Sequence, residues 1–472
     1  MPITKILIAN RGEIAVRIVR ACAELGIRSV AVYTEPDRYA LHVKRADEAY
    51  SLGEDPLAGY LNPHHIVNLA VQTGCDALHP GYGFLSENAE LAEICAQRGI
   101  TFIGPAAPVI RRMGDKTRAR QAMIEAGVPV TPGSENNLSG LDEARREAER
   151  VGYPVMLKAT SGGGGRGIRR CDNEPELARN FERVVSEATK AFGSAEVFLE
   201  KCIVDPRHIE VQILADHHGN TIHLFERDCS IQRRNQKLIE IAPSPQLTPE
   251  QRTYVGDLAV RAAEAVSYTN AGTVEFLFTG DQVYFMEMNT RVQVEHTITE
   301  QITGVDIVRE QIRIAAGEPL AYQQSDIRHQ GFALQFRINA EDPKNNFLPS
   351  FGRISRYYAP GGPGVRVDTA IYTGYTIPPY FDSMCLKLIA WNLSWEGALD
   401  RAKRAINDMR LQGVKTTAPY YLKILDDPGF RGGHFDTGYV DAHPELLNYS
   451  EKSNPEEIAL AIATAIAAHT GL

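Results

Sequence analysis

The stretch Tyr284-Phe-Met-Glu-Met-Asn-Thr-Arg-Val-Gln-Val-Glu-His296 alternates apolar and polar side chains almost without interruption. Successive side chains of an extended chain point to opposite faces, so the polar ones share a face. These polar side chains are Glu287, Asn289, Arg291, Gln293 and Glu295. Two carboxylates, two amides and a guanidinium can hold metal-bound phosphate and move a proton. We therefore expect a ligand-binding strand here, with a ladder of surface ion pairs as the alternative.

The apolar run Glu275-Phe-Leu-Phe278 precedes this stretch and is joined to it through Thr279-Gly-Asp-Gln282. If the hairpin loop has three or five residues, Glu275 lies opposite Glu287 on the same face. Two facing carboxylates repel unless a cation lies between them, and hard oxygen ligands suit Mg²⁺ with a nucleotide. The sequence predicts this metal pair, and a register slip of one residue would remove it.

Composition limits the class of protein. With 472 residues, 43% of them hydrophobic and 23% charged, the chain is predicted to form about three globular domains. The net charge of −9 and the lack of a Lys/Arg-rich block argue against nucleic acid as a partner. No apolar run reaches the roughly 20 residues that cross a bilayer, and the N-terminal run is not a secretory signal. The seven cysteines are scattered without a Cys-x-x-Cys pair, which argues against a disulfide framework or metal cluster and favours a cytoplasmic protein.

Short apolar runs alternate with helical patterns over residues 1–114, which predicts a doubly wound parallel sheet. Ile6-Leu-Ile-Ala9 leads into Asn10-Arg-Gly-Glu13, where the glycine serves either a nucleotide fingerprint or a tight turn. The missing G-x-G-x-x-G pattern favours the turn. Pro80-Gly-Tyr-Gly83 falls where the carboxyl end of a strand is expected, and such ends face ligands. Tyr82 is therefore a candidate site residue, although a simple turn explains the glycines equally well.

A second unit begins near Gly114, with Lys116 opening a helix. The strand pattern Val155-Met-Leu-Lys158 then runs into a loop with four consecutive glycines, residues 162–165. Glycines let backbone N–H groups approach a phosphate and let the loop move as a lid. The Walker A pattern is absent, so a flexible linker is the alternative for this loop taken alone. The preceding lysine and the polar strand downstream favour nucleotide binding.

Residues 196–214 are predicted to form two strands with acidic groups, which suits a strand edge that contacts adenine and ribose. His208 alternates with apolar residues there, where a lone histidine is more often structural. Residues 232–237 are expected to form a polar loop with three cations close to developing phosphate charge, with a solvated basic loop as the alternative. Both segments thus extend the expected nucleotide site.

The last third of the sequence is rich in strand patterns, and Arg337 shares a strand face with Gln335 and Asn339. Arg337 is expected to point into the same site. Residues 395–411 read as a helix. The Ala-rich pattern over residues 456–466 predicts an amphipathic helix that packs on its own chain, with docking on a partner chain as the alternative.

Several motifs together resemble those of the biotin carboxylase family, over residues 3–445. In chain order they are Ile8-Ala-Asn-Arg-Gly-Glu-Ile-Ala15, His79-Pro-Gly-Tyr-Gly-Phe-Leu-Ser-Glu-Asn88, Met113-Gly-Asp-Lys116, Lys158-Ala-Thr-Ser-Gly-Gly-Gly-Gly-Arg-Gly167, Glu226-Arg-Asp-Cys-Ser-Ile-Gln-Arg-Arg234, Glu287-Met-Asn-Thr-Arg-Val-Gln-Val-Glu-His296 and Arg337-Ile-Asn-Ala-Glu-Asp-Pro343.

The resemblance implies a mixed α/β and α+β fold in three parts. A Rossmann-like parallel-sheet domain is expected over residues 1–114, and an ATP-grasp domain over residues 115–330 with a mobile Gly-rich lid at 131–203. A β-rich C-terminal domain is expected over residues 331–447, followed by a tail with an amphipathic helix at 448–472.

The resemblance also implies roles for individual residues. Those matching nucleotide contacts are Lys116, Lys158, Gly164, Gly165, Glu200, Lys201, Ile203, His208 and Gln232, with Asn235 beside them. Those matching Mg²⁺ or Mn²⁺ ligands are Glu275, Glu287 and Asn289, and those matching a bicarbonate site are Arg291, Gln293 and the backbone of Val294. Glu295 matches the base that deprotonates bicarbonate, Lys237 a residue that stabilises carboxyphosphate, Arg337 a residue that holds the biotin enolate, and Tyr82 a neighbour of that pocket.

The implied reaction uses ATP, Mg²⁺ or Mn²⁺ and bicarbonate to carboxylate biotin. No Ala-Met-Lys-Met biotinylation motif and no second catalytic domain follow, so biotin is expected on a separate carrier or carboxyltransferase chain, and the protein itself is expected to be a homodimer. Residues 232–241 and the tail resemble the biotin carboxylase subunit of a two-subunit pyruvate carboxylase more than the acetyl-CoA carboxylase component, which stays the alternative. Asn235 replaces a histidine common in the family, and Pro363 replaces an aromatic residue of the dimer region.

Two hypotheses outside the family are an ATP-grasp ligase with another acceptor and a catalytically silent nucleotide-binding scaffold. Arg337 beside Glu295-His296 argues against the first hypothesis. The intact set of Glu275, Glu287, Arg291 and Glu295 argues against the second.

Overall fold

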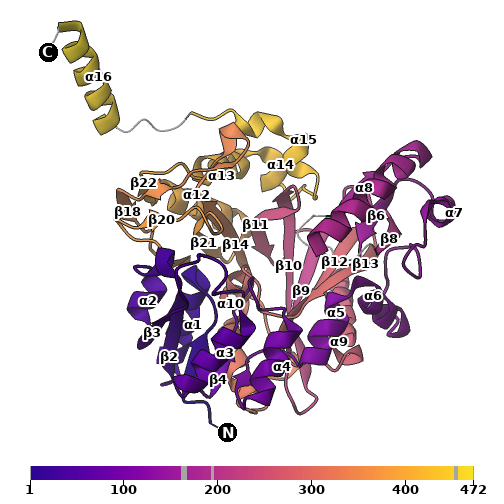
Figure 1. Ribbon diagram of the computed structural model, residues 1–472. Coiled ribbons are helices and arrows are strands. Elements are labelled where there is room, and N and C mark those ends of the chain that lie inside the picture. Colours follow the sequence, from indigo (N-terminus) through magenta and orange to yellow (C-terminus); the bar gives the residue numbers. More distant parts are fainter. Residues whose placement is uncertain (1, 161–166, 193–195, 451–454, 471–472) are drawn as a thin grey trace.

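The computed structural model describes residues 2–160, 167–192, 196–450 and 455–470. Its N-terminal unit is a five-stranded parallel sheet in the order β3-β2-β1-β4-β5 (Figure 1). The strands are β1 (Lys5–Ile8), β2 (Arg28–Tyr33), β3 (Glu48–Ser51), β4 (Ala77–His79) and β5 (Thr101–Phe102). Ile6 and Ile8 pack in one apolar core with α1 (Gly12–Glu24), whereas Leu7 packs in another with α3 (Pro63–Gln72) and α4 (Ala89–Gln97). Helices thus cover both faces, which confirms the predicted doubly wound sheet.

The turns that follow β1 and β4 lie together at the carboxyl edge of this sheet. α1 begins at Gly12, whose φ of +68° is left-handed, so the predicted tight turn is confirmed. Gly81 has a φ of +63°, and a Cβ there would lie 2.9 Å from Nδ2 of Asn10. Asn10 Nδ2 donates to the carbonyl oxygens of Pro80 and Tyr82, both at 2.7 Å. Tyr82 therefore lies at the ligand-facing edge of the sheet.

An eight-stranded antiparallel sheet in the order β13-β12-β9-β10-β11-β14-β21-β19 forms the centre of the molecule. Its strands are β9 (Arg207–Ala215), β10 (Thr221–Arg233), β11 (Gln236–Ala242), β12 (Asn270–Thr279), β13 (Gln282–Asn289), β14 (Phe332–Asn339), β19 (Val365–Thr369) and β21 (Met384–Asn392). β11 pairs with β14, with Glu240 opposite Gln335. Strands from both sides of residue 330 therefore belong to one sheet.

A smaller antiparallel sheet in the order β7-β6-β8 stands beside the large one (Figure 1). Its strands are β6 (Val155–Ala159), β7 (Ile168–Cys171) and β8 (Val197–Lys201), packed with α7 (Leu141–Val151) and α8 (Glu174–Phe192). Val155, Leu157 and Leu199 belong to an apolar core of this unit's own. The unit spans most of the region predicted as a lid, and the predicted phosphate-binding Gly164 and Gly165 lie outside the described residues.

Two predicted helices can be compared with the structure. α6 (Lys116–Glu125) begins at Lys116 as predicted, because Asp115 accepts hydrogen bonds from the first-turn N–H groups. α12 (Trp395–Asp408) is shorter than the predicted helix over residues 395–411, because β22 (Arg410–Gln412) pairs with β18 (Arg356–Tyr358).

Apart from the tail helix, the other α-helices of the described residues are α2 (Leu41–Arg45), α5 (Ala107–Gly114), α9 (Pro249–Ala265), α10 (His296–Thr303), α11 (Ile307–Ala315), α13 (Ala418–Asp426), α14 (Pro428–Arg431) and α15 (Tyr439–Ala442). The short strands form the pairs β15 (Glu341–Asp342) with β16 (Leu348–Pro349) and β17 (Gly352–Arg353) with β20 (Thr376–Ile377). All seven cysteines are buried and free. Across the described ranges, every helix is too short or too polar to span a bilayer.

The tail helix α16 (Pro455–Thr470) projects away from the rest of the molecule at the C-terminal end (Figure 1). Its described apolar side chains are exposed, with Leu460 at 68%, Ile462 at 54% and Ile466 at 57%. The prediction that this helix packs on its own chain is therefore wrong, because its apolar side chains meet solvent instead of a core.

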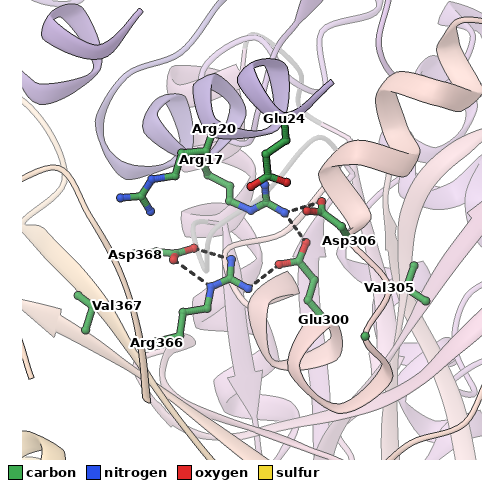
Figure 2. A pocket seen from close by; sticks show the side chains of 10 residues that line it. Arg17, Arg20, Glu24, Glu300, Val305, Asp306, Arg366, Val367 and Asp368 are labelled. Atoms are coloured by element: carbon green, nitrogen blue, oxygen red, sulfur yellow. Dashed lines mark hydrogen bonds and ion pairs between the residues drawn. The ribbon is translucent and has the colours of Figure 1, made fainter. Parts of the chain in front are cut away.

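A partly buried ion-pair cluster ties α1, α10 and β19 together (Figure 2). Arg17 donates to Glu300 at 2.9 Å and to Asp306 at 2.5 Å. Arg366 donates to Glu300 at 2.7 Å and to Asp368 at 2.8 Å. Glu300 lies in the middle of α10, so this cluster fixes the helix that begins immediately after the predicted base.

The Asp368 ion pair predicts an acid-sensitive contribution to stability. Burial alone would raise the pKa of Asp368, but Arg366 outweighs burial and holds that pKa well below its usual range. The contribution is complete above the unfolded-chain pKa of about 3.9 and is lost as the pH falls below it, at about 1.4 kcal/mol per pH unit. We expect the free energy of unfolding of Asp368→Asn, measured in urea from about pH 5 to about pH 2.5, to fall less steeply than that of the wild type. Equal slopes would contradict this assignment.

Candidate functional site

The hairpin of β12 and β13 places Glu275 directly opposite Glu287, as predicted. The structural reason differs from the one expected. The connecting loop has two residues, Gly280 and Asp281, and an even loop alone would set Glu275 opposite Met286. The register shifts by one residue immediately after Glu275, and this β-bulge restores the facing carboxylates.

The polar strand ends earlier than the sequence suggests. β13 ends at Asn289, and the chain then turns until α10 begins after Glu295. The predicted strand alternation is therefore wrong for Arg291, Gln293 and Glu295, because a turn replaces the strand there. Gln293 Nε2 nevertheless donates to Glu275 at 2.6 Å, so the turn folds back over the polar face of the hairpin.

Lys237 of β11 lies among carboxylates from three segments of the chain. Its ammonium contacts Glu210 of β9, Glu275 of β12 at 3.0 Å and Glu295 at 2.7 Å. Burial alone would lower the pKa of Lys237, but these carboxylates raise it well above its usual range. A charge held permanently at this point can stabilise an anion that forms during a reaction.

Residues 232–237 form a tight hairpin rather than the predicted polar loop. β10 extends to Arg233 and β11 begins at Gln236, so the turn consists of Arg234 and Asn235, with φ of +49° and +62°. This pattern fits a type I′ turn, and asparagine adopts left-handed angles more readily than most residues. The exposed Asn235 thus has a backbone role, and its contact with a nucleotide stays a prediction.

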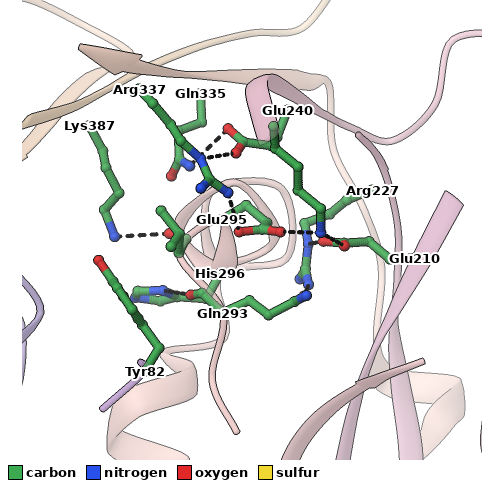
Figure 3. A network of polar contacts seen from close by, with 12 residues as sticks. Tyr82, Glu210, Arg227, Glu240, Gln293, Glu295, His296, Gln335, Arg337 and Lys387 are labelled. Carbon is green, nitrogen blue, oxygen red and sulfur yellow. Dashed lines mark hydrogen bonds and ion pairs between the residues drawn. The ribbon is translucent and has the colours of Figure 1, made fainter. Parts of the chain in front are cut away.

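Glu295 is held by two cations, one at each carboxylate oxygen. Lys237 donates to one oxygen at 2.7 Å. Nη2 of Arg337 donates to the other at 3.1 Å (Figure 3). Burial alone would raise the pKa of Glu295, but Lys237, Arg337 and Arg227 outweigh burial and the nearby Glu210, and the pKa is lowered. Glu295 is therefore ionised at neutral pH, and it becomes a stronger base when a substrate draws either cation away.

Arg337 of β14 points toward Glu295, as predicted, with Gln335 on the same strand face (Figure 3). Arg337 Nε donates to Glu240 at 2.5 Å, and Gln335 Nε2 donates to the other oxygen of Glu240 at 3.0 Å. Asn339, the third residue of this predicted face, donates to Glu341 at 3.3 Å instead. One side of the Arg337 guanidinium is thus anchored while the other faces the predicted base.

Three buried charged residues, Arg227, Glu210 and Glu240, support this site, although the sequence did not predict a role for them. Arg227 is fully buried and donates to Glu210 and to the amide oxygen of Gln293, both at 2.5 Å (Figure 3). Glu240 holds the arginine of β14 in the same way. The signal in the sequence is a charged residue inside an apolar strand pattern, as in Ile209-Glu-Val-Gln-Ile213. Such a charge is retained in a core only when it is paired.

Arg291 joins the turn to the N-terminal unit. Its Nε donates to Glu87 at 3.1 Å, and its Nη2 donates to Asn289 at 2.9 Å. Glu87 also accepts a hydrogen bond from the N–H of Thr290 at 3.2 Å. Burial alone would lower the pKa of Arg291, but Glu87 raises it. Sequence reasoning missed Glu87, although this residue lies within a motif that carries the family resemblance.

Two of the three lysines predicted to contact the nucleotide lie near the facing carboxylates, and the third does not. Lys158 of β6 forms an ion pair with Glu200 of β8, and Lys116 Nζ lies 3.9 Å from Glu287. Burial lowers the pKa of Lys116, partly opposed by the charge of Glu287. These residues therefore gather beside the facing carboxylates. By contrast, Lys201 donates to two backbone carbonyl oxygens, at 2.9 and 2.8 Å, so its ammonium serves the small sheet.

The other nucleotide-side residues are His208, Gln232 and Ile203. His208 Nε2 lies 2.7 Å from Glu275 Oε2, and Gln232 is largely buried near the end of β10. Ile203 follows β8 and is partly exposed. His208 thus acts on the metal-side carboxylate, and contacts of these three residues with a nucleotide stay predictions.

The facing carboxylates fit a divalent cation. Partial burial raises the pKa of Glu287, and the negative charge of Glu275 raises it further. Asn289 Nδ2 donates to Glu275 at 2.7 Å, which brings a third oxygen-bearing side chain to the pair. Carboxylate and amide oxygens are ligands that Mg²⁺ accepts, and a cation here would relieve the repulsion. When bound, it would neutralise phosphate charge.

Tyr82 is linked to the turn through Glu13 and Lys387. Its hydroxyl donates to Glu13 of α1, and Lys387 of β21 pairs with Glu13 at 3.1 Å. Lys387 also donates to the carbonyl oxygen of Val294 at 2.9 Å (Figure 3). The site as a whole thus combines an ionised carboxylate, fixed cations and a metal pair, which suits the transfer of an anionic group.

Three family models match consecutive parts of the chain. “Biotin carboxylase, N-terminal domain” matches residues 2–110, “Carbamoyl-phosphate synthase L chain, ATP binding domain” matches residues 115–323, and “Biotin carboxylase C-terminal domain” matches residues 335–442.

Curated proteins and solved structures resemble the whole chain. It is 55% identical over 471 residues to the 2-oxoglutarate carboxylase small subunit of Hydrogenobacter thermophilus, covering 99% of both chains. It is 53% identical over 441 residues to a pyruvate carboxylase subunit of Methanothermobacter thermautotrophicus, covering 93% of this chain and 90% of that one. A crystal structure of the biotin carboxylase domain dimer of the Hydrogenobacter 2-oxoglutarate carboxylase, with MgADP, ADP and bicarbonate, matches with a TM-score of 0.94 at 56% identity, covering 96% of this chain and 100% of that one.

Proposed function

The chain belongs to the biotin carboxylase family of ATP-dependent enzymes, and we propose that it carboxylates biotin carried by a separate subunit, with bicarbonate as the carbon source. One observation carries the residue assignments. Glu295 is ionised between Lys237 and Arg337, beside the facing Glu275 and Glu287. This arrangement supports the assignment of a base, two anion-stabilising cations and a metal pair around one turn.

The proposed first step joins bicarbonate to phosphate. Arg291, Gln293 and the backbone of Val294 hold bicarbonate while Glu295 accepts its proton. The freed oxygen attacks the γ-phosphorus of ATP, and the bond from that phosphorus to the bridging oxygen breaks, giving carboxyphosphate and ADP. Positioning and charge neutralisation supply most of the rate enhancement in such a transfer.

The second step transfers the carboxyl carbon. The C–O bond of carboxyphosphate breaks to give CO₂ and phosphate, and the phosphate accepts the proton of biotin N1. The nitrogen then forms its bond to the carbon of CO₂. Lys237 stabilises carboxyphosphate and Arg337 stabilises the biotin enolate, while Tyr82 borders the biotin pocket. Because Glu295 is protonated in the first step, Lys237 and Arg337 can exchange its carboxylate for these anions.

On the nucleotide side we propose contacts with ATP from Lys116, Lys158, Gly164, Gly165, Glu200, Lys201, Ile203, His208, Gln232 and Asn235. Glu275, Glu287 and Asn289 would hold Mg²⁺ or Mn²⁺. The ion pairs between Lys158 and Glu200 and between Lys116 and Glu287 support this placement, because phosphate can replace either carboxylate as the partner of lysine.

The direct test measures ATP hydrolysis by the purified chain with Mg²⁺ and bicarbonate, with and without free biotin. We expect biotin to stimulate hydrolysis and carboxybiotin to form. Turnover that requires bicarbonate but ignores biotin would indicate an ATP-grasp ligase with another acceptor. A folded chain without any bicarbonate-dependent turnover would overturn the proposal.

The final acceptor is proposed to be a 2-oxo acid, with pyruvate as the first candidate and the chain as the biotin carboxylase subunit of a two-subunit pyruvate carboxylase. The Methanothermobacter relative supports pyruvate. The Hydrogenobacter relative favours 2-oxoglutarate as the second candidate. An acyl-CoA acceptor is the remaining alternative. The test is the transfer of labelled bicarbonate to each of these acceptors by the chain together with its carrier subunit.

We further propose that α16 docks on the carrier subunit. The Hydrogenobacter relative aligns over 99% of this chain, which includes the tail, and the apolar side chains of Ile462 and Ile466 share one exposed helix face. Burying two such side chains contributes about 1.5–3 kcal/mol each.

Replacing both isoleucines, Ile462→Ser and Ile466→Ser, is therefore expected to weaken binding of the carrier subunit by about 100-fold or more. Turnover with free biotin should be unchanged. Ala465→Ser with Ala468→Ser on the same helix is the matched control, and calorimetric titration with the carrier subunit is the measurement. Unchanged affinity of the isoleucine variant would contradict the docking role.

A homodimer is proposed as well, because the matching Hydrogenobacter biotin carboxylase domain is a dimer. A cytoplasmic location is proposed from the seven free, buried thiols and the use of ATP. Light scattering of the purified chain tests the first of these proposals.

A further inference from the structure

Lys387 is a fully buried lysine on β21, the strand next to the edge strand β19 of the large sheet. In strand register it lies between Arg337 of β14 and Asp368 of β19. Arg337 holds the side chain of the predicted base, and Asp368 belongs to the ion-pair cluster behind α10. A row of charged side chains thus crosses three strands beneath the turn that carries Glu295.

The ammonium of Lys387 reaches the backbone of that turn. It donates to the carbonyl oxygen of Val294 at 2.9 Å, one residue before Glu295. Two cations on neighbouring strands therefore hold the same turn, Arg337 through a side chain and Lys387 through the main chain. The main-chain bond fixes the peptide plane between Val294 and Glu295, and with it the direction in which the carboxylate leaves the backbone.

The same ammonium reaches the biotin side through Glu13. The distance between Lys387 Nζ and Glu13 Oε1 is 3.1 Å, and that oxygen also accepts the hydroxyl hydrogen bond of Tyr82. Burial alone raises the pKa of Glu13, and Lys387 opposes this rise. The second oxygen of Glu13 is buried without a hydrogen-bond partner among the described residues. The pair is thus an incompletely satisfied buried ion pair, which is costly to keep for stability alone.

We propose that Lys387, paired with Glu13, is a positioning residue that couples Tyr82 to the turn of Gln293, Val294 and Glu295 and thereby sets the affinity for bicarbonate. This inference rests on the proposed function of that turn. An apolar pair of similar volume would stabilise the fold as well or better. Such a pair would form neither the hydrogen bond to the Val294 carbonyl oxygen nor the one to the Tyr82 hydroxyl.

The test separates positioning from packing by removing the pair as a unit. Each single replacement leaves a buried charge without its partner, so Lys387→Met or Glu13→Gln alone is expected to lower the melting temperature. The double variant Lys387→Met/Glu13→Gln removes both charges and is expected to recover most of that loss. Its KM for bicarbonate in the biotin-independent ATPase assay should rise about tenfold or more, with KM for MgATP within about twofold of the wild type.

The matched control uses a lysine with the same pattern of contacts far from the turn. Lys5 pairs with Glu48 at 2.8 Å and donates to the carbonyl oxygen of Thr73 at 2.6 Å. Lys5→Met/Glu48→Gln is expected to leave both KM values unchanged. A folded Lys387→Met/Glu13→Gln variant with a wild-type KM for bicarbonate would overturn the inference.

Tyr82→Phe keeps the inference testable if the double variant fails to fold. It removes the hydrogen bond from the Tyr82 hydroxyl to Glu13 and leaves the side chain of Lys387 and the residues of the turn unchanged. We expect it to raise KM for bicarbonate about threefold or more even without biotin, because the coupling runs through Glu13. A change in the KM for biotin alone, with a wild-type KM for bicarbonate, would overturn the coupling. Loss of all bicarbonate-dependent turnover in the wild type would instead overturn the proposed function.

Discussion

Replacing Glu295 with glutamine is expected to lower bicarbonate-dependent ATP turnover by about 10²–10⁴-fold, the range typical of a lost general base. The amide has nearly the same shape as the carboxylate but does not accept a proton at neutral pH. It also leaves Lys237 and Arg337 without a shared counter-charge. The loss should therefore appear in kcat as well as in the KM for bicarbonate.

The measurement is steady-state ATPase activity with bicarbonate varied at saturating MgATP. Glu318→Gln, an exposed carboxylate beyond α11, provides the matched control and should behave as the wild type. A Glu295→Gln enzyme with more than about one tenth of wild-type turnover would remove this residue from the role of base.

Replacing Glu287 with glutamine is expected to lower turnover at limiting Mg²⁺ by about 10²–10³-fold, because several kcal/mol of charge stabilisation are lost with the metal. The fold should survive. The side chain is 40% exposed, and its partner Lys116 lies 3.9 Å away. The substitution also lowers the repulsion within the carboxylate pair, so it removes a ligand without creating a buried charge.

Turnover measured across a Mg²⁺ titration tests this role. We expect a higher Mg²⁺ requirement together with a wild-type melting temperature. Asp281→Asn, in the two-residue loop of the same hairpin, is the control for a carboxylate that the site does not use. Near-native activity of Glu287→Gln at limiting Mg²⁺ would refute the ligand assignment.

Much of the fold is predictable from local patterns. Alternation of short apolar runs with helical segments predicts the parallel N-terminal sheet, and Asp115 before Lys116 starts α6 at the predicted residue. Patterns of this kind depend on interactions between residues close in the sequence, so the elements they predict are present in the structure. The tail helix is predicted as an element for the same reason, whereas its packing depends on a surface that the sequence does not specify.

The site shows where sequence reasoning needs three-dimensional information. Glu275 faces Glu287 only because a β-bulge corrects a two-residue loop, and neither feature follows from residue counting. The alternating pattern places Arg291 and Glu295 on a strand, whereas a turn carries them back over the hairpin. Buried pairs of charges on neighbouring strands, such as the one between β9 and β10, depend on strand order.

The continuity of the large sheet across residue 330 determines which parts of the enzyme can move against one another. Lys237 on β11 and Arg337 on β14 lie on directly paired strands, so their separation belongs to a single rigid body. Lys158 and Glu200 lie on the small, separate sheet. If the small sheet closes over ATP, as the family resemblance implies, we expect the distance from Lys158 to the proposed metal pair to change and the spacing of Lys237 and Arg337 to stay fixed. In the proposed cycle, release of ADP would then leave the two cations around Glu295 in place for the carboxyl transfer.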